Sequence, residues 1–571
     1  MKVRGIGLLV GLLMIVGGGL LAHFTQTAGG IRIEDVRFKG ASGATMSALV
    51  YIPPTATEKT PAPGILAVHG YFNSRETQDG FAIEFARRGY VVVALDQRGH
   101  GYSDGPAFAD GFGGPDGLNY LRSLPYVDKD NIGLEGHSMG GWTVLAAAAA
   151  MPHAYKAVVL EGSSTGAPFA KEGTPSWPRN LAVVFSQYDE FSLLMWGSPK
   201  PKALAATPKV QAVFGVSEPI EIGKVYGDIA AGTGRVLQQP AVIHPGDHIS
   251  HEAIGYALDW FGKTLVGGKA LPLDDQIWFN KEVGTGIALI GLIVALLGVF
   301  DVLLGLPFLS ALSATPMPSA PVAASVRGKG VAFWLTVLIP VLTFYPAFMF
   351  GDNFLPASRW LPQTFGSQIM AWAVINLIIT LTLMPFAPRS QERKGIVIPS
   401  VLIAVAVVVC AYAAAWAVDL LWKIDFRFWF FALKVPSGAQ FRTALIDVAP
   451  LTAYFVVGLH VLQRNFGAPG TPAMMHYLTT IGASALGFVL LEVVQYGALW
   501  MRGQIINPLP FYPTIPLATI IGINFIPVLT AVAIISTFTW RRTQSSLPGA
   551  LICGVLVTWY VTVGTASHVA I

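Results

Sequence analysis

The sequence predicts a doubly wound α/β domain with a mostly parallel sheet, followed by an all-α transmembrane bundle. Three observations support this fold class. Short apolar segments alternate with helical segments between residues 60 and 265. A Gly-x-Ser-x-Gly pentapeptide at residues 136–140 joins one of these segments to a helix. Residues 284–567 contain one apolar run after another, each long enough to cross a bilayer.

Composition separates a water-soluble part from a membrane part. The chain of 571 residues is 53% hydrophobic and only 12% charged, whereas about 25% of residues are charged in ordinary globular domains. The deficit of charged residues falls on the C-terminal half of the chain. The formal net charge of +4 is small for this length and gives no reason to expect a nucleic-acid partner. Cys410 and Cys553 both fall in apolar runs, so the soluble part is expected to lack disulfides.

We expect three segments along the chain. Residues 1–28 carry two basic residues before an apolar stretch, and we interpret them as a transmembrane anchor, with a cleaved signal peptide as the alternative. Residues 30–268 form the α/β domain. Residues 280–571 form a polytopic membrane domain of about eight helices. Those helices are predicted near residues 284–306, 331–350, 366–387, 396–421, 443–463, 474–500, 514–538 and 548–567.

The distribution of basic residues predicts the orientation in the membrane. With the N-terminus inside, ten Lys and Arg lie on the inner side and six in the outer connections. The α/β domain is therefore expected on the extracytoplasmic side, in an integral protein of the plasma membrane. The outer connection 422–434 is crowded with aromatic and cationic side chains, which suits the lipid headgroup region.

Within the α/β domain, six short apolar runs predict strands that are buried on both faces of a parallel sheet. They lie at residues 64–69, 90–96, 131–135, 157–160, 181–185 and 235–243. Helices are expected at residues 80–88, 142–151 and 252–265. The alternation of the two element types predicts the doubly wound arrangement.

Ser138 is the predicted catalytic nucleophile. It lies between Gly136 and Gly140 at a strand-to-helix junction, where a tight, strained turn lifts the hydroxyl clear of the sheet. The following helix brings backbone N–H groups and a positive dipole end next to a developing oxyanion. The alternative is a Gly-rich turn in an inactive relative.

Three motifs carry a resemblance to the α/β-hydrolase superfamily: residues 69–71 (HGY), 96–103 (DQRGHGYS) and 136–141 (GHSMGG). The resemblance covers residues 60–265. It implies a Ser–His–acid triad in the chain order Ser, acid, His, and an oxyanion hole made of two backbone N–H groups. For this chain it implies Ser138 as nucleophile and the N–H groups of Tyr71 and Met139 as oxyanion donors.

The triad histidine is expected in the loop after the last predicted strand. His248 fits best, because the family usually places this residue after a Gly-containing turn and before the final helix; His251 and His244 are alternatives. His, Asp and Glu crowd this loop, but the HxHxDH spacing of binuclear metallohydrolases is absent. A Ser elbow also needs no metal, so we expect neither a metal nor a cofactor.

The triad acid is expected at Asp189, which follows the predicted strand 181–185. Glu218 is the main alternative, although it would require an additional strand before residue 235. Glu161 and Glu190 are the remaining candidates. The acid must hold the imidazole in the tautomer that accepts the serine proton.

These features predict a membrane-bound serine hydrolase that cleaves an ester, thioester or amide through an acyl-enzyme. The expected partners are a small-molecule or lipid-like acyl substrate and the bilayer. Acyl transfer to a membrane-borne acceptor is a close variant. A transporter or receptor-like protein with a non-catalytic hydrolase-like domain is the alternative class.

Glu492 and Gln495 lie on one face of a predicted span and suggest either a proton or substrate path or interhelical hydrogen bonds.

Overall fold

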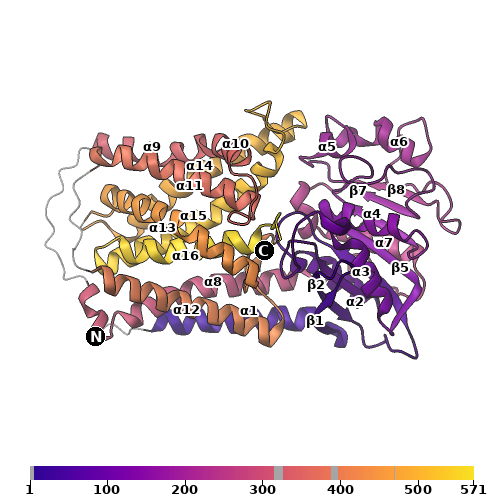
Figure 1. Ribbon diagram of the computed structural model, residues 1–571, viewed down its shortest axis with the longest axis horizontal. Coiled ribbons are helices and arrows are strands. Elements are labelled where there is room, and N and C mark those ends of the chain that lie inside the picture. Colours follow the sequence, from indigo (N-terminus) through magenta and orange to yellow (C-terminus); the bar gives the residue numbers. More distant parts are fainter. Residues whose placement is uncertain (1–4, 314–325, 388–395, 469, 571) are drawn as a thin grey trace.

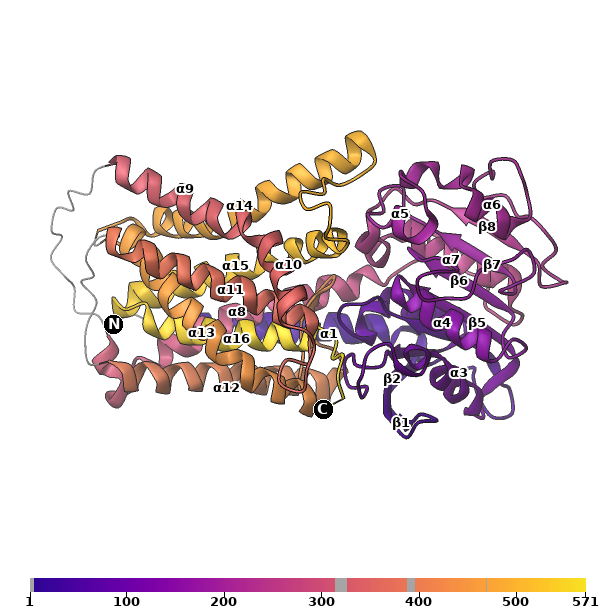
Figure 2. The same ribbon diagram turned by 45° about the horizontal axis from the view of Figure 1, so that its top comes forward.

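The α/β domain lies at one end of a long helical bundle (Figure 1). The structure is a computed structural model and describes residues 5–313, 326–387, 396–468 and 470–570. Figure 2 shows the same end-to-end arrangement after rotation. The first helix begins at the end of the bundle that is remote from the α/β domain, and the last described residues lie next to that domain.

An eight-stranded sheet forms the centre of the α/β domain, with the spatial order β1-β2-β4-β3-β5-β6-β7-β8. β2 pairs antiparallel with β1 and β4, and all other neighbours are parallel. The strands are β1 (Arg32–Lys39), β2 (Thr45–Ile52), β3 (Ala62–Val68), β4 (Val91–Asp96), β5 (Val127–His137), β6 (Ala157–Glu161), β7 (Leu181–Val184) and β8 (Arg235–Gln238). The predicted fold class is confirmed.

Helices cover both faces of the sheet, because strand residues alternate between the faces. In β3, Leu66 packs in the same cluster as α3 (Gly114–Ser123) and α4 (Met139–Ala150). Ile65 faces the other way, toward α2 (Asp79–Arg87) and α7 (His251–Thr264). Three short helices stand between β7 and β8: α5 (Ser192–Trp196), η4 (Pro201–Ala206) and α6 (Pro208–Phe214).

The sequence analysis missed β1 and β2. β1 reads RIEDVRFK and is partly exposed along its whole length, so it contains no apolar run. It pairs only with β2, at the edge of the sheet. β2 is buried after its first residue but contains Thr, Ser and Tyr among its apolar residues. An apolar-run criterion therefore finds central parallel strands and overlooks this antiparallel pair.

Nine helices in the described residues are long and apolar enough to cross a membrane. They agree with the anchor and the eight predicted spans, except that α9 and α10 together make one span. The helices are α1 (Ile6–Gln26), α8 (Phe279–Leu303), α9 (Val326–Leu342), α10 (Phe344–Phe354), α11 (Thr364–Leu383), α12 (Val397–Trp422), α13 (Gly438–Phe466), α14 (Ala473–Arg502), α15 (Ile515–Thr543) and α16 (Leu547–Gly564).

The connection between α12 and α13 forms a two-stranded hairpin of β9 (Phe426–Phe428) and β10 (Phe431–Leu433). Its cations are buried against the α/β domain: Arg427 has no exposed surface and Lys434 is 4% exposed. This differs from the headgroup position expected from composition. The charged side chains of the hairpin have carboxylate partners inside the protein, Asp425 for Arg427 and Glu76 for Lys434, so neither cation is buried without a counter-ion.

Candidate active site

Ser138 occupies a strained turn between β5 and α4. Its φ of 54° and ψ of −120° lie outside the conformations that L-residues favour. A Cβ atom on Gly136 would lie 2.2 Å from the carbonyl oxygen of Gly140, and one on Gly140 would lie 2.1 Å from that of Val68. Both positions therefore require glycine. The backbone N–H of Ser138 donates to the Glu161 carbonyl oxygen at 2.8 Å, which fixes the turn against β6.

The loop after β3 passes beside the nucleophile. A Cβ atom on Gly70 would lie 3.4 Å from the Cβ of Ser138. The next residue, Tyr71, is held at both ends: its carbonyl oxygen is 2.6 Å from His100 Nε2, and its hydroxyl is 2.5 Å from His568 Nε2. Tyr71 follows Gly70 in this loop, and Met139 is the first residue of α4. Their backbone N–H groups are therefore the candidate oxyanion donors.

Asp189 pairs with His244. The Nδ1 of His244 lies 2.7 Å from Asp189 Oδ2, and both side chains are buried. β7 and β8 set this pairing, since Tyr188 forms a parallel bridge with Ile243 and the following residues therefore lie side by side. The other oxygen of Asp189 accepts the N–H of Phe191 at 2.7 Å. A carboxylate held this way can fix the tautomer of an imidazole.

Electrostatics favours a charged form of His244. Burial disfavours the imidazolium, but the negative charge of Asp189 and its hydrogen bond outweigh that cost. Glu190 and Asp247 add to the effect, so the pKa of His244 is raised above 6.5. An imidazole that gains a proton readily and keeps its partner is suited to general-base chemistry near neutral pH.

The hydrogen bond of Asp189 goes to His244 and not to His248. His248 is in η5 (His244–Ile249), and its ring centroid is 4.1 Å from that of His137. Its Nδ1 has no hydrogen-bond partner among the described residues. Burial lowers the pKa of His248 to about 3, and the nearby His244 contributes to the shift. The structure thus places Asp189 next to His244, which the sequence analysis gave as an alternative. It does not pair Asp189 with His248, which the sequence analysis preferred.

The other candidates occupy different environments. His251 is exposed at the start of α7, with its Nδ1 3.1 Å from Gln276 Oε1. Glu218 is exposed in a loop after α6, and no additional strand lies between β7 and this residue. Glu161 ends β6, buried, with both carboxyl oxygens lacking partners in the described chain. In the same described ranges, no group of three or more His, Cys, Asp or Glu could hold a metal ion.

Glu190 links the Asp–His pair to the membrane bundle, and the sequence analysis did not foresee this role. Its Oε2 accepts the backbone N–H of His244 at 2.9 Å, and its Oε1 accepts the hydroxyl of Tyr496, in α14, at 2.7 Å. Burial and the charge of Asp189 raise the pKa of Glu190 to about 7. The only hint in the sequence is that Glu190 adjoins Asp189.

Glu492 and Gln495, the two polar residues that the sequence analysis singled out on α14, differ in their hydrogen bonding. Gln495 donates to the hydroxyl of Tyr345 at 2.8 Å and accepts the N–H of Ile506 at 2.8 Å. It therefore makes one interhelical hydrogen bond, to α10, and one to the loop that follows its own helix. Glu492 is 8% exposed, and both of its carboxyl oxygens lack hydrogen-bond partners in the described residues.

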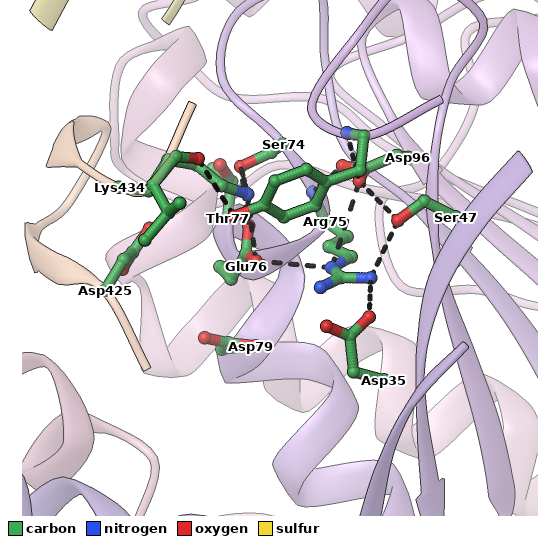
Figure 3. A network of polar contacts seen from close by, with 12 residues as sticks. Asp35, Ser47, Ser74, Arg75, Glu76, Thr77, Asp79, Asp96, Asp425 and Lys434 are labelled. Atoms are coloured by element: carbon green, nitrogen blue, oxygen red, sulfur yellow. Dashed lines mark hydrogen bonds and ion pairs between the residues drawn. The ribbon is translucent and has the colours of Figure 1, made fainter. Parts of the chain in front are cut away.

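A buried ionic network joins the α/β domain to the hairpin (Figure 3). Glu76, in η2 (Arg75–Gln78), lies 2.8 Å and 3.0 Å from the Nζ of Lys434 and 3.2 Å from the Nε of Arg75. Arg75 continues the network to Asp35 at 2.6 Å. On the hairpin, Arg427 pairs with Asp425 at 2.7 Å. Despite burial, Lys434 and the two arginines hold the pKa of Glu76 well below its usual range.

The hairpin also touches the loop that carries His244. The indole N–H of Trp429 donates to the carbonyl oxygen of Pro245 at 2.6 Å. The neighbouring Phe430 accepts a hydrogen bond from the side chain of Asn73 at 2.8 Å. Elements of the membrane bundle therefore contact both the loop of the Asp–His pair and the loop beside Ser138.

Comparisons with known proteins agree with the fold of this domain. The family model for the alpha/beta hydrolase fold matches residues 63–194. A monoacylglycerol lipase of Mycolicibacterium smegmatis is 32% identical over 221 residues, which cover 36% of this chain and 72% of that protein. A serine hydrolase-like protein of Dictyostelium discoideum is 26% identical over 127 residues, 22% of this chain and 34% of that protein.

Among solved structures, an esterase of Pyrococcus furiosus aligns with 42% of this chain and 92% of its own, at 17% identity and a TM-score of 0.30. The match to the mycobacterial protein is long enough and similar enough to establish the family. The strained turn at Ser138 and the order of strands in the sheet agree with it. The chain belongs to the alpha/beta hydrolase family.

Proposed function

We propose that the protein is a membrane-bound serine hydrolase that cleaves carboxylic esters through an acyl-enzyme. Ser138 is the nucleophile, His244 the general base and Asp189 the acid. The observation that carries the proposal is the 2.7 Å contact between His244 and Asp189, at the same edge of the sheet as the strained Ser138 turn. The similarity to a protein named as a monoacylglycerol lipase supports an ester as the substrate.

In the proposed reaction these three side chains act in sequence. The Oγ of Ser138 attacks the ester carbonyl carbon while the Nε2 of His244 takes the hydroxyl proton. The backbone N–H groups of Tyr71 and Met139 stabilise the oxyanion that forms. The bond to the leaving alcohol then breaks, and His244 returns the proton to that alcohol. Water, activated by the same imidazole, hydrolyses the acyl-enzyme; acyl transfer would differ only in what attacks at this step.

Substitution of each triad member tests the proposal. Ser138→Ala should abolish labelling by a fluorophosphonate and lower ester turnover on the order of 10³-fold or more. His244→Ala should have a comparable effect, whereas His248→Ala should retain most activity if it folds. Asp189→Asn should be severe and Glu218→Gln mild, since Glu218 is exposed.

The outcomes separate the alternatives. A larger loss for His248→Ala than for His244→Ala would move the base to His248. Folded wild-type protein that neither reacts with the fluorophosphonate nor turns over any ester in a panel would favour a non-catalytic binding module.

We also propose that the site faces the extracytoplasmic side, on the basis of the charge distribution between the two ends of the bundle.

A further inference from the structure

A small apolar chamber lies directly behind the loop beside Ser138. Its volume is 70 Å³, and helices α11, α13, α15 and α16 form most of its wall. On the side of the α/β domain it is closed by Phe72 and Asn73, the two residues after Tyr71. Asn73 is held in place, since its backbone N–H donates to the Gly564 carbonyl oxygen at 3.0 Å. The chamber thus borders the segment that supplies an oxyanion donor.

A second, larger cavity lies next to this chamber in the bundle. It has a volume of 580 Å³ and lies mainly between α9, α11 and α13. Tyr454, Phe455 and Leu529 line both cavities, so these side chains form the wall between them. The larger cavity reaches the beginning of α9, at the end of the bundle remote from the α/β domain (Figure 1). Cavities of about 300–1,000 Å³ hold ligands of drug size or larger.

The chemistry of the walls selects a hydrocarbon occupant. None of the described side chains that line either cavity is charged, and most are aliphatic or aromatic. Apolar cavities of this kind exclude water and bind hydrocarbon. The helices around them are long and apolar enough to cross a membrane. The surrounding solvent would then itself consist of acyl chains.

Packing connects the cavities to the reaction centre. The ring of Tyr71 contacts Phe72 and Phe365, with centroid separations of 5.3 Å and 5.5 Å. Gly70, which precedes Tyr71, lies close to the nucleophile: a Cβ atom placed on it would be 3.4 Å from the Cβ of Ser138. A substrate carbonyl group bound at the backbone N–H of Tyr71 would therefore lie beside the segment that closes the chamber, because Phe72 and Asn73 directly follow Tyr71. An acyl chain attached to that carbonyl would enter the chamber by displacing the Phe72 side chain, which closes it on this side.

From these observations we propose that the membrane bundle binds the hydrocarbon chain of the substrate, and that the substrate class is a long-chain acyl ester drawn from the bilayer. The proposal rests on the proposed function, because it assigns the chain of the ester whose carbonyl reacts with Ser138. It makes the bundle a specificity element as well as an anchor.

Filling the larger cavity tests this proposal. A Cβ atom on Gly458 would meet only the Cε2 of Tyr454, at 4.0 Å, so a Phe side chain there can grow into the cavity without moving backbone. Gly458→Phe should lower turnover of p-nitrophenyl palmitate at least about tenfold and leave p-nitrophenyl butyrate within about twofold of wild type. The matched control is Gly17→Phe on the exposed side of α1, where no atom of the described chain lies within 4 Å of the added Cβ. It should change neither rate.

An unchanged ratio of palmitate to butyrate turnover in Gly458→Phe would overturn the proposal, as would an equal change in the control. A second measurement is independent of turnover. Ser138→Ala protein is irradiated with a diazirine-bearing palmitate ester in phosphatidylcholine vesicles, and crosslinked peptides are identified by mass spectrometry. Crosslinks to α11, α13 or α15 that Gly458→Phe removes support the proposal; crosslinks confined to the outer surface of α12 contradict it.

These two measurements also separate the proposal from the proposed function. If wild-type protein hydrolyses no ester but the crosslinks to α11, α13 or α15 appear, then the chain site exists and the assigned reaction is wrong. If short esters are hydrolysed and no such crosslink forms, the reaction stands and the chain site is refuted.

Discussion

Replacing Glu76 by Gln should uncouple the α/β domain from the membrane bundle. The carboxylate is 5% exposed and lies 2.8 Å from the Nζ of Lys434 across the boundary between the two parts (Figure 3). Arg75 and Arg427 keep other carboxylate partners, Asp35 and Asp425. Lys434 therefore becomes the buried cation without a counter-ion, while the size and shape of the side chain at position 76 stay the same.

The magnitude follows from the cost of an unpaired buried charge. Removing one partner of a buried ion pair destabilises a protein by about 3–5 kcal/mol. For a domain of this size each kcal/mol shifts the midpoint of unfolding by about 2–4 °C. The first unfolding transition of Glu76→Gln should therefore fall by on the order of 10 °C. Scanning fluorimetry of the purified full-length protein in detergent measures it through intrinsic tryptophan emission.

Glu221→Gln provides the matched control. Glu221 also pairs with a lysine, Lys224, at 3.0 Å, but both side chains are largely exposed. Water screens such a pair, so its removal should shift the transition by less than about 2 °C. Equal shifts for the two variants would refute the reasoning, because burial would then have no bearing on the strength of the contact. A Glu76→Gln variant with wild-type stability would do the same.

Three further outcomes follow from the site. For a soluble short-chain ester, kcat/KM should fall as the pH drops through an apparent pKa above 6.5, because Asp189 raises the pKa of His244 and only the neutral imidazole accepts the serine proton. Activity that stays level well below about pH 6 would instead indicate His248, whose pKa burial lowers to about 3. Tyr496→Phe leaves Glu190 with one acceptor unpaired and should lower kcat about tenfold at unchanged KM, whereas a rise in KM alone would argue against a positioning role. Ser176→Cys, in an exposed loop, should react with an impermeant maleimide in intact cells, and reaction only after permeabilisation would reverse the proposed orientation.

The strained turn at Ser138 and the central strands could be predicted because their signals are local. The glycines around Ser138 are dictated by atoms within a few residues and by the adjacent strand β3. Strands buried on both faces must be apolar throughout, as β4 and β6 are, and this pattern is visible without any knowledge of their neighbours. The half-exposed β1 has no such pattern.

The partner of Asp189 could not be chosen in the same way. His244 and His248 are four residues apart in one loop, and either fits the chain order of the triad. The choice depends on the bridge between Tyr188 and Ile243, which aligns residue 189 with residue 244. The support from Tyr496 lies 306 positions further along the chain than Glu190, where no sequence period could reveal it.

The contact between Glu190 and Tyr496 has a consequence for biosynthesis. Domains emerge from the ribosome in chain order, so the α/β domain is complete before α14 has been made. Until that helix is inserted, Glu190 lacks its hydroxyl donor, and the hairpin that contacts the loop of His244 is also made only after the α/β domain. The Asp189–His244 pair therefore reaches its final surroundings only after the membrane bundle has been made and inserted as far as α14.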